Sequence, residues 1–239
     1  MLAYAKTDIG LIRETNEDNY AFAPPHLYVV ADGMGGHVAG EIASKHAVNE
    51  VKEYINNHID QASPDILLEQ AINQANQVVY QLAQSKNEYQ GMGTTVTAVY
   101  IDEEVIYWAH VGDSRIYLLH DETIEQLTND HSLVSELVQS GSITMEEAHT
   151  HPQRNILTRA VGIYPQIKID RGKFNWKPND SILLCTDGLT NMINEQAIYL
   201  TIKNGENDGS EIVEKLIEQA KNAGGFDNIT AILVKYGDA

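Results

Sequence analysis

The chain has 239 residues, of which 43% are hydrophobic and 21% are charged, values typical of a globular domain with a real core. It carries 16 Lys and Arg against 34 Asp and Glu, a net charge of −18 that repels nucleic acid and anionic membranes. No apolar run approaches the roughly 20 residues needed to cross a bilayer. The first residues lack the charged segment and apolar run of a signal peptide, so we expect a cytoplasmic protein.

The first third of the chain predicts two strands followed by two helices. The strands are expected at residues 2–7 and 27–31, and the helices at residues 39–57 and 64–85. The start of the second helix is well marked, because Ser63 can cap it, Pro64 suits its first turn and Asp65 complements its dipole.

The rest of the chain predicts a strand meander, a polar helical segment and a second set of strands and helices. Strands are expected at residues 94–101, 105–110, 116–119 and 123–127, then at 167–173, 181–185 and 229–236. Helices are expected within residues 130–162, where Thr144 and Glu147 form a possible capping box, and at residues 195–203 and 210–223. The only cysteine, Cys185, lies in an apolar strand, which excludes an intrachain disulfide and predicts a buried side chain. Strand runs segregated from helix pairs favour an α+β protein, a single domain over residues 1–239 with two antiparallel sheets, each covered by a helix pair.

Five aspartates lie where apolar strands begin or end: Asp18, Asp32, Asp113, Asp187 and Asp227. Taken alone, Asp32-Gly33 and Asp187-Gly188 are ordinary turn pairs. Taken together, the carboxylates could converge on one rim of a sandwich, where they would repel one another unless cations were bound. An oxygen-only ligand set favours Mg²⁺ or Mn²⁺ over structural zinc.

The glycines at residues 33, 35 and 36 let the backbone approach a ligand closely, and the Gly33 carbonyl could itself bind a metal ion. The segment at residues 32–37 resembles a nucleotide phosphate loop only superficially, because it lacks the lysine and hydroxyl residue of that motif.

At this point the sequence resembles the metal-dependent serine/threonine protein phosphatases of the protein phosphatase 2C type, as a short bacterial member. The matching strings follow the family order over nearly the whole chain: residues 7–10 with Arg13, then 16–18, 32–37, 91–95, 112–115, 130–132, 186–190 and 227–230. The resemblance implies a four-layer α-β-β-α sandwich with a flap at about residues 131–162. Three histidines of this segment, His131, His149 and His151, lack tight ligand spacing and favour positioning of a phosphopeptide over a metal site.

The resemblance also implies two or three Mn²⁺ or Mg²⁺ ions and a role for each site residue. Asp32 would bridge two ions, with the Gly33 carbonyl on one and Asp187 and Asp227 on the other. Asp18 would act through a bound water, and Asp113 with Asp187 would hold a third ion. Arg13 would bind the substrate phosphate.

The implied reaction is the hydrolysis of phosphoserine and phosphothreonine in proteins by in-line attack of a metal-bridging hydroxide. Eukaryotic relatives have a histidine directly after the Asp-Gly pair as the proposed general acid. This chain has Met34 there, and His37 three positions later is the candidate. The implied partners are phosphorylated proteins and a cognate bacterial serine/threonine kinase in a signalling pathway, and we expect a monomer.

Two other functions fit part of the sequence. A catalytically silent relative that binds phosphoproteins should have lost a ligand, yet Asp32, Asp113, Asp187 and Asp227 are all present. A metal-dependent nuclease would fit the carboxylates but not the acidic charge or the lack of a basic stripe. The phosphatase interpretation is therefore favoured.

Overall fold

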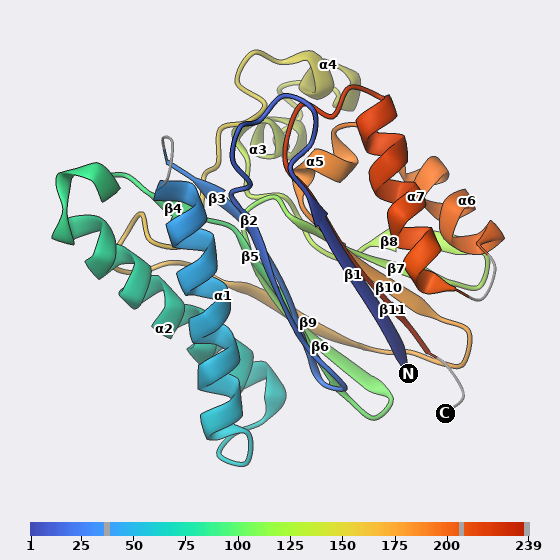
Figure 1. Ribbon diagram of the computed structural model, residues 1–239, viewed down its shortest axis with the longest axis horizontal. Coiled ribbons are helices and arrows are strands. Elements are labelled where there is room, and N and C mark those ends of the chain that lie inside the picture. The colour runs from blue at the N-terminus through green and yellow to red at the C-terminus, as the bar shows by residue number, and fades with distance from the viewer. Residues whose placement is uncertain (36–38, 206–207, 237–239) are drawn as a thin grey trace.

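The computed structural model describes residues 1–35, 39–205 and 208–236, and in it two antiparallel sheets pack face to face between layers of helices (Figure 1). The first sheet has the order β1-β11-β10-β7-β8. Its strands are β1 (Leu2–Asp8), β7 (Arg115–His120), β8 (Thr123–Gln126), β10 (Ser181–Cys185) and β11 (Ile229–Lys235). The second sheet has the order β2-β3-β5-β6-β9, with β4 paired to β3. Its strands are β2 (Asp18–Ala23), β3 (Leu27–Met34), β4 (Gly93–Thr94), β5 (Val96–Asp102), β6 (Val105–Val111) and β9 (Asp170–Asn175).

Each sheet is covered on its outer face by one helix pair. Helices α1 (Ala39–His58) and α2 (Pro64–Ser85) pack on the second sheet, and α6 (Glu195–Asn204) and α7 (Gly209–Asn222) pack on the first. None of the helices in the described residues combines the length and the apolar character needed to span a bilayer. The four-layer α-β-β-α arrangement expected from the sequence is confirmed.

Both faces of the central strands are buried, which creates three apolar layers. Along β3, Val29 and Ala31 pack against α1 and α2, whereas Tyr28 and Val30 point between the sheets. The same alternation holds in β11, where Leu233 faces α7 and Ile232 does not. This period of two is the strand geometry itself, and it explains why these strands are continuous apolar runs in the sequence.

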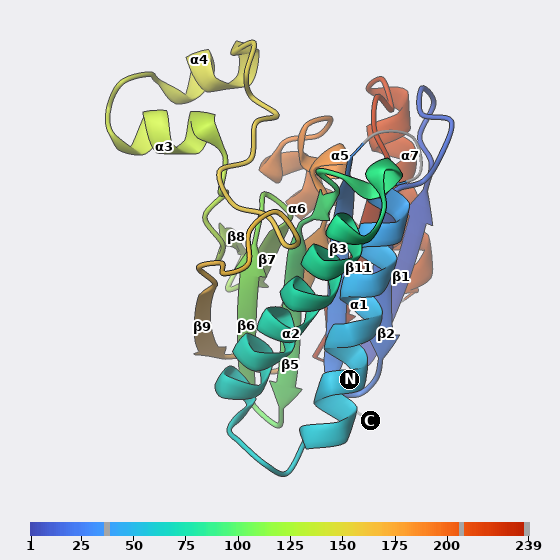
Figure 2. The ribbon, with the colours of Figure 1, turned by 90° about the vertical axis from the view of Figure 1, so that its left-hand side faces the viewer.

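A smaller group of elements stands apart from the sandwich. Helices α3 (Leu133–Gln139) and α4 (Met145–Thr150) project from one end of it (Figure 2). The predicted capping box of α4 is confirmed: Thr144 Oγ1 accepts from the Glu147 N–H (3.2 Å), and the Glu147 carboxylate accepts from the Thr144 N–H (2.8 Å). The short helices η1 (Asn87–Tyr89) and α5 (Asp187–Thr190) complete the described elements.

The structure corrects the sequence analysis at several points. Strand β2 and helix α5 were not predicted, and β9 covers residues 170–175 instead of 167–173. Ser63 occupies the N-cap position of α2, but its hydroxyl donates to Asp65 Oδ1 (2.6 Å) instead of accepting from the helix backbone. Cys185 is buried as expected.

Candidate metal and phosphate site

A cavity of about 410 Å³ opens at one end of the sandwich, and we call it the acidic pocket. The loops between β1 and β2 and between β6 and β7 contribute to it, as do the end of β3 and the start of α5. Its walls include six of the eight predicted site residues, namely Arg13, Asp32, Gly33, Asp113, Asp187 and Asp227. His37, the seventh, lies outside the described residues. Residues that are far apart in the chain therefore meet at one rim.

Asp18, the eighth predicted residue, is only 4% exposed and does not line the cavity. It lies opposite Asp32 in the β2–β3 ladder. Its Oδ2 accepts hydrogen bonds from the hydroxyls of Thr186 (2.8 Å), which directly follows β10, and Thr230 (2.7 Å) in β11, and both strands belong to the other sheet. Asp18 therefore ties the two sheets together directly beside the pocket.

The two Asp-Gly pairs of the pocket are not turns. Gly33 lies within β3, and a Cβ atom there would sit 2.1 Å from the carbonyl oxygen of Gly40. Gly188 lies in α5, and a Cβ atom there would sit 1.9 Å from the carbonyl oxygen of Asn228. The turn interpretation of these isolated pairs is therefore wrong: each glycine allows another backbone segment to pack against a candidate ligand.

Two carboxylate oxygens beside the pocket are buried and have no hydrogen-bond partner among the residues that the structure describes: Oδ1 of Asp18 and Oδ1 of Asp187. The second oxygen of Asp187 accepts from the Asn191 side chain (2.9 Å). Buried polar atoms are almost always paired, so each such oxygen needs an explanation. A bound cation would provide one.

Burial and mutual repulsion raise the pKa of these acids. Burial raises the pKa of Asp18 to about 7, with further contributions from Asp187 and Asp227. Burial and the charge of Asp18 raise the pKa of Asp32 well above its ordinary value. Asp113 and Asp187 shift in the same direction for the same two reasons. Without bound positive charge, the carboxylates around the acidic pocket would therefore stay protonated at pH values where ordinary carboxylates are ionised.

The residues fit hydrated divalent cations better than a closed protein cage. Among the residues that the structure describes, no three His, Cys, Asp or Glu side chains form a compact ligand cluster by themselves. The available donors are all oxygens, and Mg²⁺ in particular keeps several waters and takes few carboxylates. An open acidic pocket with unpaired oxygens is consistent with that chemistry.

Arg13 lies at the mouth of the pocket, where its guanidinium donates to Asp227 Oδ2 (2.8 Å) and remains half exposed. The loop that carries it is held by Asn228, whose Oδ1 accepts from the Glu17 N–H (2.8 Å). The Asn228 amide also donates to the carbonyls of Ile9 (3.0 Å) and Thr15 (2.9 Å). This positioning by Asn228 was not predicted, although the residue directly follows a candidate ligand in the sequence.

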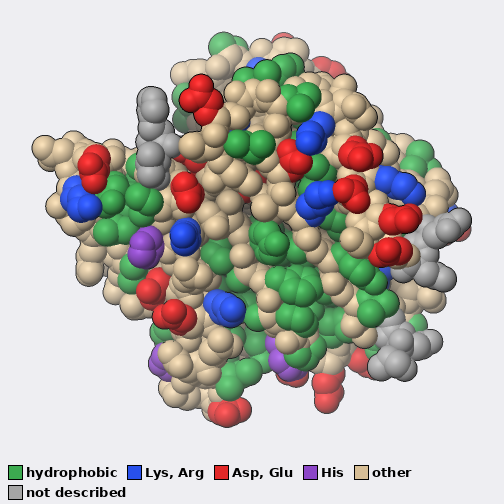
Figure 3. Space-filling view, in the orientation of Figure 1, with side chains coloured by type: hydrophobic (Ala, Val, Ile, Leu, Met, Phe, Trp, Pro, Cys, Tyr) green, Lys and Arg blue, Asp and Glu red, His purple; other side chains and the backbone are tan. Residues whose placement is uncertain are grey.

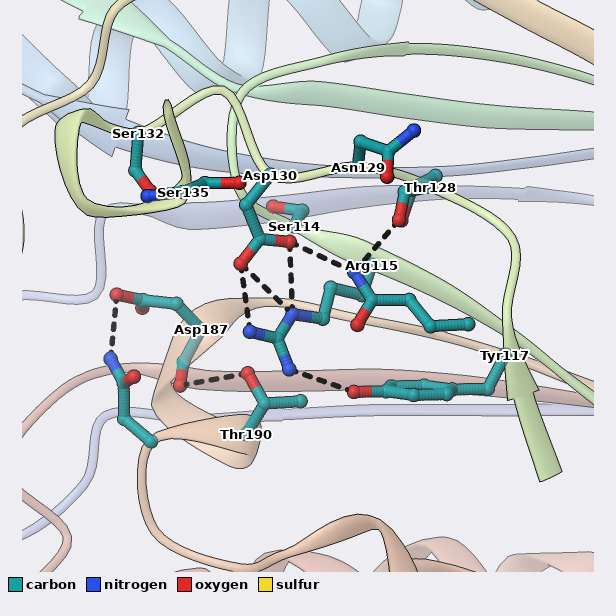
Figure 4. A network of polar contacts seen from close by, with 12 residues as sticks. Ser114, Arg115, Tyr117, Thr128, Asn129, Asp130, Ser132, Ser135, Asp187 and Thr190 are labelled. Carbon is teal, nitrogen blue, oxygen red and sulfur yellow. Dashed lines mark hydrogen bonds and ion pairs between the residues drawn. The ribbon is translucent and has the colours of Figure 1, made fainter. Parts of the chain in front are cut away.

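Arg115 and Asp130 form a bidentate ion pair next to the pocket (Figure 4), with the Arg115 Nη2 2.7 Å from Asp130 Oδ2. The third nitrogen, Nη1, donates to the hydroxyl of Tyr117 (2.9 Å). The positive charge of Arg115 is one of the causes that lower the pKa of Asp113 against its net upward shift. Arg115 therefore offsets part of the repulsion at the rim without entering the acidic pocket.

The histidines of the predicted flap differ in their surroundings. His131 is 4% exposed, and its Nδ1 accepts from the Gly112 N–H (3.1 Å), so it is enclosed in the protein and not available to a peptide. His149 lies beside a second cavity.

On the face seen in Figure 3, Asp and Glu side chains are interspersed with Lys and Arg, and hydrophobic side chains gather near the centre.

Comparison with known proteins identifies the family. The family model described as protein phosphatase 2C matches residues 14–204. The chain is 40% identical to the protein phosphatase PhpP of Streptococcus pneumoniae over 97% of this chain and 96% of that protein. It is similar to the crystal structure of the serine/threonine phosphatase Stp1 from Staphylococcus aureus, with a TM-score of 0.92 and 37% identity over 99% and 95% of the two chains.

A second similar structure is the catalytic domain of the serine/threonine protein phosphatase PstP in complex with two manganese ions. It has a TM-score of 0.87 and 32% identity over 97% of this chain and 96% of that one. These matches span nearly the whole length of both partners, as the order of the eight sequence strings predicted. The chain belongs to the protein phosphatase 2C family.

Proposed function

We propose that this protein is a metal-dependent phosphatase that removes phosphate from phosphoserine and phosphothreonine in proteins. The observation that carries the proposal is a pair of buried carboxylate oxygens, on Asp18 and Asp187, beside a pocket of converging aspartates. Within residues 1–35, 39–205 and 208–236 neither oxygen has a hydrogen-bond partner. Family membership supports the reaction, and the manganese-bound PstP structure supports divalent cations at this kind of site.

The proposed ligands are the oxygens around the acidic pocket. Asp32 and the Gly33 carbonyl would share two ions with Asp187 and Asp227, and Asp113 with Asp187 would hold a third. Asp18, which is buried beside the pocket, would act on a bound ion through a water. Two or three Mn²⁺ or Mg²⁺ ions there would lower the pKa of water and offset charge on the phosphoryl oxygens.

The remaining steps belong to side chains of the chain itself. Arg13 is the proposed phosphate ligand, which is supported by its half-exposed guanidinium at the pocket mouth beside Asp227. Asn228 holds the loop that carries Arg13, and Asn191 orients the Asp187 carboxylate. We propose His37 as the donor of the proton that the leaving serine or threonine oxygen needs. Charges and hydrogen-bond donors such as those of Arg13 stabilise a transition state most when they are fixed in position before the reaction.

The proposed partners are phosphorylated proteins and the serine/threonine kinase that modifies them in the same cell. We further propose that the protein acts as a monomer with one catalytic domain, and that residues 131–162 form a flap beside the site. The projection of α3 and α4 from the sandwich supports the flap (Figure 2).

The test is hydrolysis of p-nitrophenyl phosphate and of a phosphothreonine peptide, first with Mn²⁺ and then with a chelator. We expect activity only with the metal, and loss of most of it in Asp187→Ala. The matched control is Asp102→Ala, which removes an exposed aspartate at the end of β5 and should retain full activity. Equal activity in chelator would refute the metal mechanism, and tight phosphopeptide binding without turnover would favour a silent binding module.

A further inference from the structure

A second and larger cavity, of about 780 Å³, continues from the acidic pocket. The two cavities share three lining residues, Asp113, Asn155 and Asp187. Sites for small molecules and peptide side chains usually have volumes of roughly 300–1,000 Å³, so the second cavity has the size of a binding site. We call it the side groove. A molecule that places a phosphate in the acidic pocket has the side groove as its immediate neighbour.

One wall of the side groove combines apolar and polar side chains and has no core of its own. It comes from α3 and α4, neither of which contains a buried residue. Val134 and Val138 are four residues apart on α3, so they lie on the same face of the helix, and both line the side groove. Apolar side chains in a concave, partly exposed position indicate a binding surface more than a packing surface.

The opposite wall belongs to the sandwich and carries apolar side chains beside the polar Thr190 and Asn191. Met192, just after α5, and Phe226, which is 60% exposed, line this side. The side groove therefore lies between two separate parts of the chain and offers hydrophobic contact from both.

Two arginines line the side groove, Arg115 and the exposed Arg154, and the charge of Arg115 is already offset. Arg115 lies there, held by the bidentate contact with Asp130 and by the Tyr117 hydroxyl (Figure 4). Such a guanidinium is fixed in direction and has its charge compensated, so it is a poor anchor for a second phosphate or for an acidic side chain. An uncharged apolar group fits the apolar side chains that the two walls contribute.

We propose that the side groove binds one bulky apolar side chain of the phosphoprotein substrate, close in sequence to the phosphorylated residue. This rests on the proposed function, because a polypeptide substrate must leave the acidic pocket along the surface, and the side groove is continuous with that pocket. Because the two cavities share lining residues, the apolar side chain should lie close in sequence to the phosphorylated residue, and an extended chain advances roughly 3.3–3.6 Å per residue.

The experiment measures kcat/KM with Mn²⁺ for phosphothreonine peptides that differ only in the position of one leucine in an alanine background, scanned over the three residues on each side. We expect leucine at one position to raise kcat/KM roughly tenfold, the low end of what apolar pockets achieve. The double variant Val138→Thr with Met192→Gln keeps the side-chain sizes but makes the walls polar, and it should lose most of that preference. Its hydrolysis of p-nitrophenyl phosphate should not change.

The matched control is Leu200→Gln, which makes the same kind of change at an exposed leucine on α6, outside the groove lining. It should leave the leucine preference intact. If p-nitrophenyl phosphate is hydrolysed but leucine has no effect at any position, or if its effect survives in the double variant, the side groove proposal is overturned and the proposed function stands. A double variant that changes only sedimentation would identify the side groove as a contact between copies, which also overturns the proposal. If no phosphate ester is hydrolysed, the proposed function itself fails.

Discussion

The loop between β6 and β7 separates two clusters of charged side chains. In one cluster the pKa of the carboxyl groups is raised, and in the other it is lowered. On one side, Asp113 lines the acidic pocket, where burial and neighbouring carboxylates raise the pKa of Asp18 to about 7. On the other side, the Gly112 N–H donates to His131, which forms a cluster with Arg159 and Asp170 that we call the stem cluster. There burial alone would raise the pKa of Asp170, but hydrogen bonds from His131 and Arg159 lower it below its ordinary value.

The difference lies in where the positive charge comes from. In the stem cluster the chain supplies it: Arg159 Nη1 lies 2.8 Å from Asp170 Oδ1, and His131 Nε2 lies 3.1 Å from Asp170 Oδ2. Because His131 Nδ1 accepts from a backbone N–H, the proton of a neutral ring must be on Nε2, where it is donated to Asp170. At the acidic pocket, the described part of the chain supplies no hydrogen-bond donor to two buried oxygens, Oδ1 of Asp187 and Oδ1 of the neighbouring Asp18. A cluster that satisfies its own charges is structural, whereas one that does not requires a ligand from outside.

The largest expected effect comes from removing one charge of the acidic pocket. Asp32→Asn keeps the shape of the side chain but removes the charge proposed to bridge two ions, a contribution of several kcal/mol to the transition state. We expect at least about a 10³-fold loss of kcat on p-nitrophenyl phosphate. In chelator the same variant should unfold at a higher temperature than wild type, because one buried like charge is gone. Asp102→Asn, at an exposed site, is the control. A fully active Asp32→Asn enzyme would contradict the proposal that Asp32 binds the metal ions.

A second prediction concerns pH in the absence of metal. The folded-state pKa of Asp18, about 7, exceeds its ordinary value of 3.8, so between these values the folded protein binds more protons than the unfolded chain. Its contribution to stability is present at low pH and is lost as pH rises toward 7, on the order of 4 kcal/mol at about 1.4 kcal/mol per pKa unit. Urea unfolding of the chelated protein from about pH 4 to pH 8 measures it.

The stem cluster should respond in the opposite direction. Asp170 has a lowered pKa, so its contribution is present above its ordinary pKa and is lost as pH falls through the lowered value. Asp170→Asn should therefore flatten the acid side of the profile and leave the neutral side unchanged. Mn²⁺ should abolish the loss near pH 7, because bound cations replace the protons. A chelated protein whose stability is constant over the whole range would contradict the comparison.

A third prediction is structural. His131→Ala removes the acceptor of the Gly112 N–H, the donor to Asp170 and the ring packed 4.7 Å from His110. We expect a loss of about 2–3 kcal/mol in the free energy of unfolding, since it leaves buried polar groups without partners. His120→Ala, at a surface histidine whose side chain is 32% exposed, should change stability little. Equal stability of the two variants would mean that the stem cluster contributes nothing.

The sequence predicted most of the fold because its signals are local. The helix at residues 64–85 was predicted to the residue, since Pro64 and the apolar period mark it. Strand β2 was missed because its six residues begin with Asp18 and Asn19, and it is extended only because it pairs with β3. Tertiary pairing of this kind leaves no local pattern.

The candidate ligands were predictable for a similar reason, since aspartates at strand ends are visible in the sequence. Their supports were not. Thr186 donates to Asp18 across a separation of 168 residues, and Asn228 donates to Ile9 across 219. Contacts between residues so distant in the chain depend on the packing of the two sheets, which no spacing encodes.

The smallest expected effect separates the outer part of the projecting segment from the stem cluster. Thr144→Ala removes one half of the α4 capping box, worth about 1 kcal/mol to a helix N-terminus. Because α4 contains no buried residue, this change should leave the global unfolding temperature almost unaltered. Its amides should instead exchange about fivefold faster, as about 1 kcal/mol of local stability implies. Thr150→Ala, whose hydroxyl makes only a long 3.4 Å contact with the Glu147 carbonyl, is the control. A lowered global unfolding temperature in Thr144→Ala would show instead that α4 and the stem cluster unfold as one cooperative unit. The stem cluster would then also stabilise the wall of the side groove that α4 forms.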